Sequence, residues 1–564
     1  MKKLFLSAIA VVLAGSAYAI PNSFSEGDIV SAEKMNENFQ ALEQQFQGSR
    51  ATTVNCAANE KIGKAIDDGY TNITVSGTCT ENLQFSMWRE DSAENGTPTG
   101  KLAPRFLKLT GADANAKIVD GSSNTESTLS VNSGATLFME NITVSGGENG
   151  VNAQRNSNLY LSGVTVENFS GSGLRVADSA WLGIDDGGVT ISGGSGAQRG
   201  INMSNGSSGW VHTSNISNVQ TGINLYGQSF TYLYNFTIEA SNRGINLGDH
   251  STVVRYQDGA GVIEGTSEYA INASRGNFYS WSPGSLTIQK LNGGRGINVS
   301  GGNSHIANLK MPDYDNTGSD WNPAINVETN SSLSLENAEI TGSTDGALVS
   351  ISGVSVTEIQ DSTLTVGSAE VGIEASGSSR LSFRNSTISG SVTDNLVNIS
   401  DGSNAEIRES TVTATTSETW SSGIYLSDAS GLKLRESTVE ASHRGMAVQR
   451  NSYAEMRNGS SITGSANHGV TVYGGAGLKI RSGSSVVSTG NSAIDISQGS
   501  WTEIDGGDGS TINRTDDGED ISVGTMSLLS IYDGNSIGEV GCYSKGYVSA
   551  NEGTVTTLAD SCTE

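Results

Sequence analysis

The sequence predicts an all-β fold, a right-handed parallel β-helix built from three-strand coils of about 22–28 residues. First, the word Gly-Ile-Asn or Ala-Ile-Asn begins at residues 200, 222, 244, 270, 296 and 324, in steps of 22 to 28 residues. Second, apolar residues alternate with polar ones within each copy, as at Ile223 and Leu225, and a period of two is typical of strands. Third, Gly, Ser, Asn and Asp separate these runs and favour turns. Several short strands in a repeat of this length indicate a solenoid of stacked coils.

The composition fits many thin layers of core joined by many turns. The chain has 564 residues, with 71 Gly, 6 Pro and 35% hydrophobic residues, which suits one elongated array. Its 32 basic and 59 acidic residues give a net charge of −27. Such a surface repels nucleic acid and anionic membranes, so we expect neither as a partner.

Residues 1–19, MKKLFLSAIAVVLAGSAYA, have the pattern of a secretory signal peptide. Two lysines precede the apolar run Leu4–Leu13, and Ala17-Tyr18-Ala19 is a small-x-small cleavage site. The apolar run is too short to span a bilayer, and we expect no membrane span elsewhere. The sequence therefore predicts a bacterial protein that is secreted, or held in the periplasm or on the outer cell surface.

Residues 20–49 form a predicted helical segment. Its apolar positions are Ala32, Met35, Phe39, Leu42 and Phe46, and the spacing of 3, 4, 3, 4 predicts a helical seam over residues 31–46. Two heptads are marginal as an isolated helix. The seam therefore pairs between chains, which would make a homo-oligomer, or it packs against the first layers of the main body.

The predicted body covers residues 50–540 and begins with a cap containing a short helix, Glu60–Asp67; residues 541–564 form a second cap. Four cysteines lie in two close pairs at the two ends, Cys56 with Cys79 and Cys542 with Cys562. Local disulfides are the simplest pairing in an oxidising compartment, each contributing about 3 kcal/mol. Catalytic or metal-binding thiols are the alternative, but neither a Cys-x-x-Cys motif nor a nearby His supports them. Capped ends would protect the open edges of a solenoid.

The asparagine of the repeated word has a predicted direction. If Ile223 and Leu225 point inward, Asn224 points outward, and its equivalents stack about 4.8 Å apart in one exterior column. The column consists of Asn202, Asn224, Asn246, Asn272, Asn298 and Asn326. Amides at this spacing either hydrogen-bond to one another along the stack or are displayed to a ligand.

Arginines precede every second copy of the word, at Arg199, Arg243 and Arg295. A row with a spacing of about 10 Å is suited to bidentate contacts with acidic groups of a polymer, although the arginines are alternatively turn caps.

Aromatic residues are concentrated in the same coils. They are Trp210, Tyr232, Tyr234, Tyr256, Phe278, Tyr279 and Trp281. Trp210 and Tyr232 share one coil position, and Tyr234 shares another with His212 and Tyr256. If exposed, the rings would form a stacking platform for sugars; if buried, they would form an internal stack. The alternation leaves both open, because Arg255 shares the phase of the apolar Leu233.

The best acidic cluster lies in the stretch PDYDNTGSDW. Asp313, Asp315 and Asp320 there resemble the start of a calcium loop, although the bidentate Glu is missing. No cofactor is required by the sequence; calcium is a candidate ligand of these three carboxylates, and a solvated turn is the alternative. The catalytic residues are unknown, because no complete constellation is present, but Asp313 and Asp315 with Arg295 are the candidates.

Two regions resemble the pectin-lyase-like superfamily of secreted proteins. Cys56–Ser86, with VSGTC and TENLQF, resembles the N-terminal cap and first coil of these proteins, and the pattern over Asn132–Ile537 resembles their body. The resemblance implies the β-helix fold but selects no chemistry, since the superfamily includes lyases, hydrolases, tailspikes, adhesins and inactive scaffolds. Residues similar to polygalacturonase motifs, Asp185-Asp186 and His468-Gly469, lie too many coils apart to share a site.

These observations favour a secreted scaffold that binds extracellular or cell-surface polysaccharide without catalysis, in adhesion or glycan binding, through the Asn202–Asn326 face. The alternative is a polysaccharide lyase or glycoside hydrolase that uses Asp313, Asp315 and Arg295. A third hypothesis is a surface-structure protein that trimerises through residues 31–46.

Overall fold

The computed structural model describes residues 50–86 and 105–562, apart from residues 257, 282, 319–321, 417, 506–508, 517, 533–534, 544, 551–553 and 560–561. The predicted signal peptide (1–19) and the predicted helical segment (20–49, with its seam over 31–46) lie outside the described residues.

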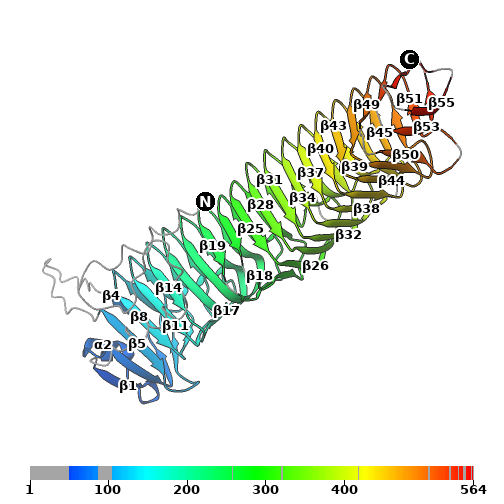
Figure 1. Cartoon of the computed structure of the whole chain (residues 1–564). Helices are drawn as coiled ribbons and strands as arrows, with labels where there is room; N and C mark the ends of the chain where they lie inside the picture. Colours follow the sequence, from blue (N-terminus) through cyan, green and yellow to red (C-terminus); the bar gives the residue numbers. More distant parts are fainter. Residues whose placement is uncertain are drawn as a thin grey trace.

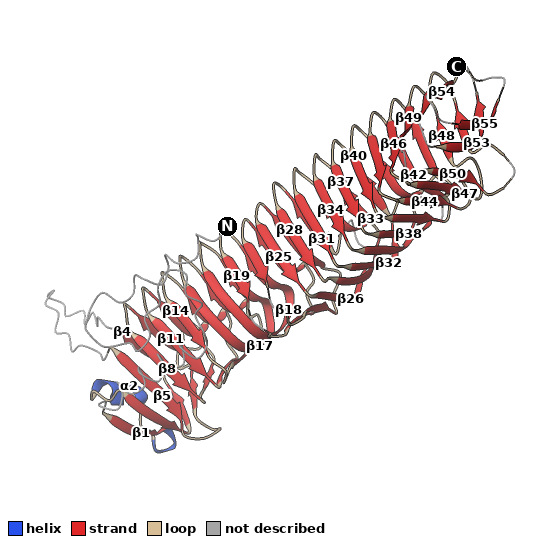
Figure 2. Ribbon diagram, in the orientation of Figure 1, coloured by secondary structure: helices blue, strands red, loops and turns tan. Residues whose placement is uncertain are grey.

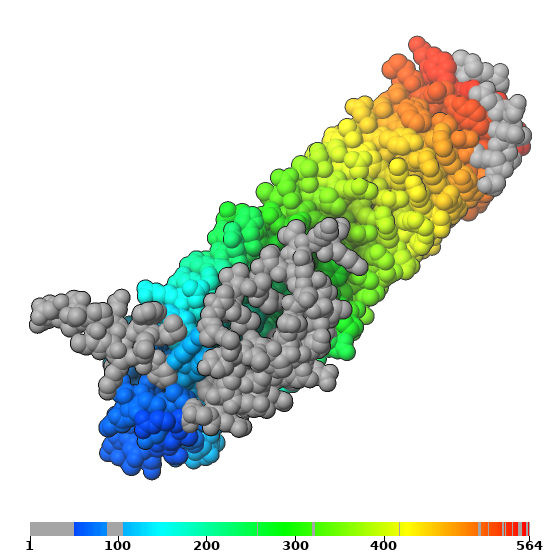
Figure 3. Space-filling view, turned by 60° about the vertical axis from the view of Figure 1, so that its left-hand side comes forward, coloured from blue at the N-terminus to red at the C-terminus, as the bar shows by residue number. Residues whose placement is uncertain are grey.

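The described chain is a right-handed parallel β-solenoid of about 19 turns, as the sequence predicted (Figure 1). Strands make up nearly all of its regular structure, with helix confined to the N-terminal end (Figure 2). Each turn contributes strands to three parallel sheets, and each strand pairs with its equivalents one turn before and one turn after. The result is a long rod that runs from the N-terminal cap to the C-terminal cap (Figure 3).

The first sheet carries the repeated Gly-Ile-Asn word. Its strands are β4 (Leu83–Ser86), β7 (Leu129–Asn132), β10 (Asn149–Gln154), β13 (Ser172–Val176), β16 (Arg199–Met203), the ends of β17 (Ser208–Leu225) and β18 (Phe230–Leu247), β21 (Tyr269–Ser274), β24 (Arg295–Ser300), β27 (Ile325–Glu328), β30 (Ala347–Ile351), β33 (Val371–Ala375), β36 (Val397–Ile399), β39 (Ser422–Leu426), β42 (Arg444–Gln449), β45 (Val470–Tyr473), β48 (Ile494–Ile496) and β51 (Ile521–Val523).

The second sheet follows the first within each turn. Its strands are β1 (Ala51–Asn55), β2 (Asn72–Ser76), β5 (Phe106–Gly111), β8 (Thr136–Glu140), β11 (Asn158–Ser162), β14 (Trp181–Ile184), the starts of β17 and β18, β19 (Thr252–Arg255), β22 (Asn277–Ser280), β25 (Asn303–Ala307), β28 (Ser332–Glu336), β31 (Val356–Gln360), β34 (Arg380–Arg384), β37 (Asn404–Arg408), β40 (Gly431–Arg435), β43 (Tyr453–Arg457), β46 (Gly477–Arg481), β49 (Trp501–Asp505), β52 (Leu528–Ile531) and β54 (Tyr547–Ala550).

The third sheet completes each turn. Its strands are β3 (Thr78–Thr80), β6 (Lys117–Val119), β9 (Thr143–Ser145), β12 (Val164–Glu167), β15 (Val189–Ser192), the middles of β17 and β18, β20 (Gly261–Glu264), β23 (Leu286–Gln289), β26 (Leu309–Asn316), β29 (Glu339–Thr344), β32 (Thr363–Ala369), β35 (Thr387–Val392), β38 (Thr411–Thr416), β41 (Thr438–Ala441), β44 (Ser461–Gly464), β47 (Ser485–Ser488), β50 (Thr511–Arg514), β53 (Ser536–Cys542) and β55 (Thr554–Leu558).

The core is a set of apolar columns that run along the axis. Ile201, Ile223 and Ile245 pair in register, and each is completely buried. Because equivalent side chains recur about every 4.8 Å, each apolar residue packs on its own counterpart in the neighbouring turns. Burying one such side chain contributes about 1.5–3 kcal/mol, so the columns supply the main stabilising term.

The glycine of the repeated word is required by close packing between two sheets. A Cβ on Gly200 would lie 2.3 Å from Cγ2 of Ile216, and one on Gly222 would lie 2.2 Å from Cγ2 of Ile238. These isoleucines belong to the third sheet, which meets the first sheet at this corner. Gly therefore leaves room for the neighbouring sheet, and neither Gly200 nor Gly222 has a positive φ that would mark it as a turn residue.

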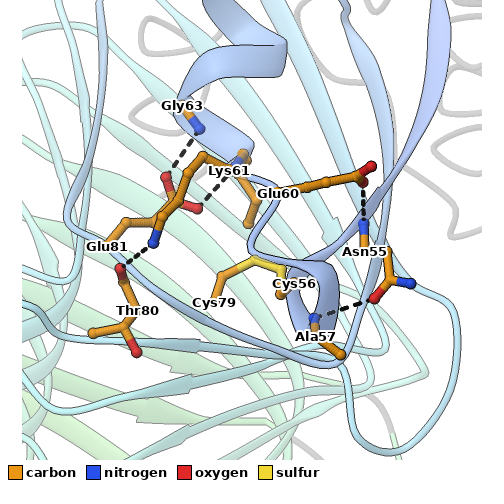
Figure 4. The surroundings of a disulfide bond; sticks show 10 residues. Asn55, Cys56, Ala57, Glu60, Lys61, Gly63, Cys79, Thr80 and Glu81 are labelled. Carbon is orange, nitrogen blue, oxygen red and sulfur yellow. Dashed lines mark hydrogen bonds between the residues drawn. A yellow bond between two sulfur atoms is a disulfide. The ribbon is translucent and has the colours of Figure 1, made fainter.

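The N-terminal cap combines a disulfide with a short helix (Figure 4). Cys56 and Cys79 are bonded, with their Cα atoms 5.0 Å apart, as predicted. Helix α2 (Ile62–Asp67) confirms the expected helix and buries Ile62 against the first turns. The carboxylate of Glu81 accepts hydrogen bonds from the backbone N–H groups of Ile62 and Gly63, at 2.8 and 3.0 Å. The carboxylate thus caps the helix and ties it to the chain beyond Cys79.

The C-terminal cap is held by the second predicted disulfide. Cys542 and Cys562 are bonded, with Cα atoms 4.9 Å apart. The backbone N–H of Cys562 donates to the carbonyl of Ala559, and β53 pairs with β50, β51 and β55. The covalent link therefore closes the last turn onto the body.

Candidate functional site

The predicted asparagine column exists, and its amides form a continuous hydrogen-bonded ladder. Asn202, Asn224, Asn246, Asn272, Asn298 and Asn326 pair in register on consecutive turns. In each step, Nδ2 of one residue donates to Oδ1 of the residue one turn earlier, at 2.7–2.8 Å. Five of the six side chains, all but Asn246, are only 4–8% exposed. The amides of the column thus satisfy one another's hydrogen-bonding groups along the axis, and the column presents little polar surface to a ligand.

The three predicted arginines also occupy alternate turns. Register places Thr221 between Arg199 and Arg243, and Tyr269 between Arg243 and Arg295. Arg243 donates from Nε and Nη2 to the two carboxylate oxygens of Glu268, at 2.8 and 2.5 Å.

Arg295 is engaged by neighbours on two sides. Its Nε donates to Oδ1 of Asn322 at 3.0 Å, and its guanidinium lies 5.7 Å from the centre of the Tyr269 ring. Arg243 and Arg295 are therefore committed to partners within the chain.

Most of the predicted aromatic residues lie on the outer face of the second sheet and form what we call the aromatic surface. It consists of Trp210, His212, Tyr232, Tyr234, Tyr256, Tyr279, Trp281 and His305. Trp210 pairs in register with Tyr232, as the sequence predicted, and the second shared position holds His212, Tyr234 and Tyr256. All eight side chains are at least partly exposed, and Trp281 is 59% exposed.

The rings contact one another from turn to turn. His212 stacks on Tyr234 with ring centres 4.1 Å apart, and Trp281 stacks on His305 at 4.0 Å. Trp210 and Tyr232 are tilted by 47°, with centres 5.5 Å apart, so at least one of them turns part of its face away from its neighbour. Burial lowers the pKa of His305, which favours the neutral imidazole in this stack. Burial likewise raises the pKa of the Tyr232 hydroxyl, so it stays a hydrogen-bond donor at neutral pH.

Two residues of the same coils point inward instead. Phe278 is completely buried in the core. Arg255 pairs with Leu233 and is also completely buried, where it donates to Oγ of Ser280 at 2.8 Å and to the Gly259 carbonyl at 2.7 Å. Burial lowers the pKa of Arg255 to about 10, which leaves it charged at neutral pH. Arg255 thus ties two successive turns together from the inside.

Two of the catalytic and calcium candidates, Asp313 and Asp315, lie on β26 of the third sheet, whereas the catalytic candidate Arg295 lies on β24 of the first sheet. Asp313 and Asp315 both face outward, and Oδ1 of Asp315 accepts from the N–H and hydroxyl of Thr317, at 3.2 and 3.0 Å. Asp320 lies outside the described residues. Within the described ranges, no group of three or more His, Cys, Asp or Glu side chains is placed to hold a metal ion. Calcium binding at Asp313, Asp315 and Asp320 therefore stays a prediction.

Three rings on the outer face of the second sheet were not identified by sequence analysis. His305 belongs to the aromatic surface because it pairs with Tyr279. Phe138 and Tyr160 precede the surface in the same register position and stack with ring centres 4.6 Å apart. Counting from the Gly of each coil finds His305, since Asn303-Ser-His repeats the spacing of Asn277-Phe-Tyr.

Comparison with known proteins supports the fold and leaves the chemistry open. Residues 295–460 match the family model described as a right-handed β-helix region. No curated protein matches the chain. Among the described residues, no helix has the length and apolarity needed to cross a membrane. The matched segment and the turns on both sides of it share one uninterrupted register, so they form a single β-helix.

Proposed function

We propose that the chain is an exported, non-catalytic scaffold that binds extracellular or cell-surface polysaccharide through the aromatic surface. One observation carries this proposal: eight aromatic and imidazole rings share the outer face of one sheet, in two adjacent columns along the axis. A sugar ring has an apolar C–H face and a hydroxyl rim. Tyr and Trp offer an apolar ring together with a polar tip, so they complement both parts.

The shape of the surface suits a polymer better than a small molecule. The rings recur at every turn, about 4.8 Å apart, and follow the axis of a rod rather than lining a closed cavity. The two disulfides fit an oxidising, extracellular setting, which agrees with the predicted signal peptide. A resemblance to the pectin-lyase-like superfamily adds polysaccharide as the class of ligand, and the absence of a complete catalytic constellation in the sequence favours binding without turnover.

The aromatic surface is a better contact region than the asparagine column. The Asn amides are buried and already paired with one another, and Arg243 is held by Glu268. A ligand at that face would have to break interactions that stabilise the fold. Trp281, in contrast, is largely exposed and its indole N–H is a potential donor.

The test compares Trp281→Ala with Trp420→Ala in binding to a panel of neutral and acidic polysaccharides. The two tryptophans are 59% and 56% exposed, but Trp420 lies in the turn before β39, outside the aromatic surface. We expect Trp281→Ala to weaken binding about tenfold, equivalent to about 1.4 kcal/mol, and Trp420→Ala to leave it unchanged. Equal binding by both variants would refute the aromatic surface, and release of unsaturated or reducing sugar ends would refute a non-catalytic role.

A further inference from the structure

Five arginines lie on consecutive turns of the second sheet, and we call them the arginine row. The row consists of Arg384, Arg408, Arg435, Arg457 and Arg481, at the ends of β34, β37, β40, β43 and β46. Register pairs each of the first three with the next, and the pairing of Met456 with Ile480 places Arg481 next to Arg457. At about 4.8 Å per turn, the five guanidinium groups extend over about 19 Å of the face. Gln360 precedes the row and Asp505 follows it.

A second row, in which glutamates alternate with lysines, lies beside the arginines. It alternates Glu406, Lys433, Glu455, Lys479 and Glu503 on the same strands and on β49. Opposite charges on adjacent strands stabilise a sheet, and the ammonium of Lys479 donates to the carboxylate of Glu503. Glu503 is therefore held by Lys479, whereas Glu406 and Glu455 form ion pairs with arginines of the row.

The carboxylates leave much of the arginine row's hydrogen-bonding capacity unused. Arg408 donates to Glu409 at 2.7 Å, and Arg457 lies 2.5 Å from a carboxylate oxygen of Glu455. Arg384, Arg435 and Arg481 instead have their nearest carboxylate oxygens at 3.5–3.9 Å, which is too long for a strong hydrogen bond.

The Nε atoms of the row are largely buried. In four of the five arginines, all but Arg408, Nε is buried and has no hydrogen-bond partner among the described residues. The side chains themselves are 31–46% exposed, so their terminal nitrogens are open to a ligand.

The local charge of this face is opposite to that of the whole chain. The outward side chains of β34–β49 on the second sheet include eight basic residues and four acidic ones: Arg380, Arg384, Arg408, Lys433, Arg435, Arg457, Lys479 and Arg481 against Glu406, Glu455, Glu503 and Asp505. Two further carboxylates, Glu358 and Glu409, pair with the row from outside these strands, so basic residues still outnumber acidic ones. The chain as a whole has a net charge of −27. Because salt screens charges beyond about 8 Å under physiological conditions, an anion close to the row responds mainly to the row.

We infer that the arginine row binds an anionic polysaccharide whose carboxylate or sulfate groups lie along the solenoid axis. A guanidinium offers paired N–H donors that match the oxygens of either group, which a lysine ammonium does not. The row occupies the same register position as Tyr234, Tyr256 and Trp281, further along the same face. In Figure 1 the intervening strands follow one another without a break from β19 to β43. One polymer lying along this stripe would meet the aromatic surface first and the arginine row beyond it.

The inference rests on the proposed function for the class of ligand and adds the sign of its charge. Its test measures binding of dextran sulfate and of dextran, which share a backbone and differ in charge, to the full mature chain and to Arg435→Gln/Arg481→Gln. Lys290→Gln/Lys310→Gln removes the same charge from the turn after β23 and from β26 of the third sheet, and serves as the matched control. Circular dichroism and thermal unfolding verify that each variant is folded. Arg435→Lys/Arg481→Lys keeps the charge and removes the paired donors.

We expect the Arg→Gln pair to weaken dextran sulfate binding at least tenfold and to reduce its dependence on NaCl, with the lysine control unchanged. Arg435→Lys/Arg481→Lys should bind dextran sulfate with an affinity between that of the Arg→Gln pair and that of the lysine control. Unchanged binding in the Arg→Gln pair would overturn the inference and identify the row as a structural ladder. Equal affinity for single-stranded DNA would also overturn it, because the row would then bind any polyanion. If Trp281→Ala leaves binding intact while the Arg→Gln pair abolishes it, the aromatic surface fails and the arginine row stands.

Discussion

The asparagine ladder should stabilise the fold by an amount that one substitution can measure. Asn272 donates to Asn246 at 2.7 Å and accepts from Asn298 at 2.8 Å, and it is 8% exposed. Replacing Asn272 with Ala removes both hydrogen bonds and leaves a donor on Asn298 without its partner, whereas Oδ1 of Asn246 keeps a contact with Nη1 of Arg243 at 3.5 Å. The lost hydrogen bond from Asn298 costs about 1 kcal/mol and its unsatisfied buried donor about 1–3 kcal/mol, so we expect a loss of about 2–4 kcal/mol.

Asn398 is the matched control for this substitution. It occupies the same column position, but its neighbours in register are Glu374 and Tyr425, and its Oδ1 has no hydrogen-bond partner among the described residues. Asn398→Ala should therefore cost less than about 1 kcal/mol. Because a solenoid can open locally, native-state hydrogen exchange of the amides around each site is the appropriate assay, supported by urea unfolding. Equal losses at Asn272 and Asn398 would refute a stabilising ladder.

Two further predictions concern the C-terminal cap and a partly buried acid. Replacing Cys542 and Cys562 with Ser should cost about 3 kcal/mol and speed hydrogen exchange only in the last turns, since each turn contacts only its neighbours; faster exchange throughout the rod would contradict this. Burial, then Glu370 and neighbouring aspartates including Asp394, raise the pKa of Glu374. The ionised carboxylate thus opposes folding at neutral pH, and stability should rise as pH falls through the raised pKa. Glu374→Gln should increase the unfolding temperature at pH 7 and reduce the gain in stability as pH falls. A lower unfolding temperature would contradict the reasoning.

The fold was accessible from the sequence because a solenoid converts a repeated word into a spatial column. The spacing of the Gly-Ile-Asn copies equals one turn, so Asn224 and Asn246 are neighbours along the axis although 22 residues separate them. The period of two then assigns Ile223 to the core and Asn224 to the outside. The two disulfides were predicted on a different ground, because cysteines close together in the sequence pair most simply with each other in an oxidising compartment.

The environment of the aromatic residues could not be read in the same way. Arg255 occupies a core position because the Ser280 hydroxyl and the Gly259 and Gly284 carbonyls surround its guanidinium. Ser280 and Gly284 belong to the next turn, which the local pattern around Arg255 does not reveal. Because Arg255 is charged, its column, which includes Leu233, did not look like a core column. The outward positions are instead those on either side of it, such as Tyr232.

The arginine row follows a different word from the one that revealed the fold. An apolar residue, Arg, and then Asn, Glu or Ser recur as Phe383-Arg-Asn, Ile407-Arg-Glu, Leu434-Arg-Glu, Met456-Arg-Asn and Ile480-Arg-Ser, in steps of 22 to 27 residues. The apolar member enters the core and the arginine faces outward. This pattern lies in the second sheet, whereas the Gly-Ile-Asn word lies in the first. A search based on the Gly-Ile-Asn word therefore does not find the arginine row.

The asparagine column and the arginine row differ in the hydrogen-bonding groups that their side chains carry. An amide carries a donor and an acceptor, so identical asparagines stacked at about 4.8 Å satisfy one another and the fold alone accounts for them. A guanidinium carries donors only, so stacked arginines repel one another and need acceptors from elsewhere. Glu406 and Glu455 supply some of these, but at 3.6 Å from Nε of Arg435 and Arg481 they are ion-pair partners rather than hydrogen-bond acceptors. A column of asparagines is thus explained by stability, whereas the arginine row keeps terminal donors that the anionic polymer we propose would satisfy.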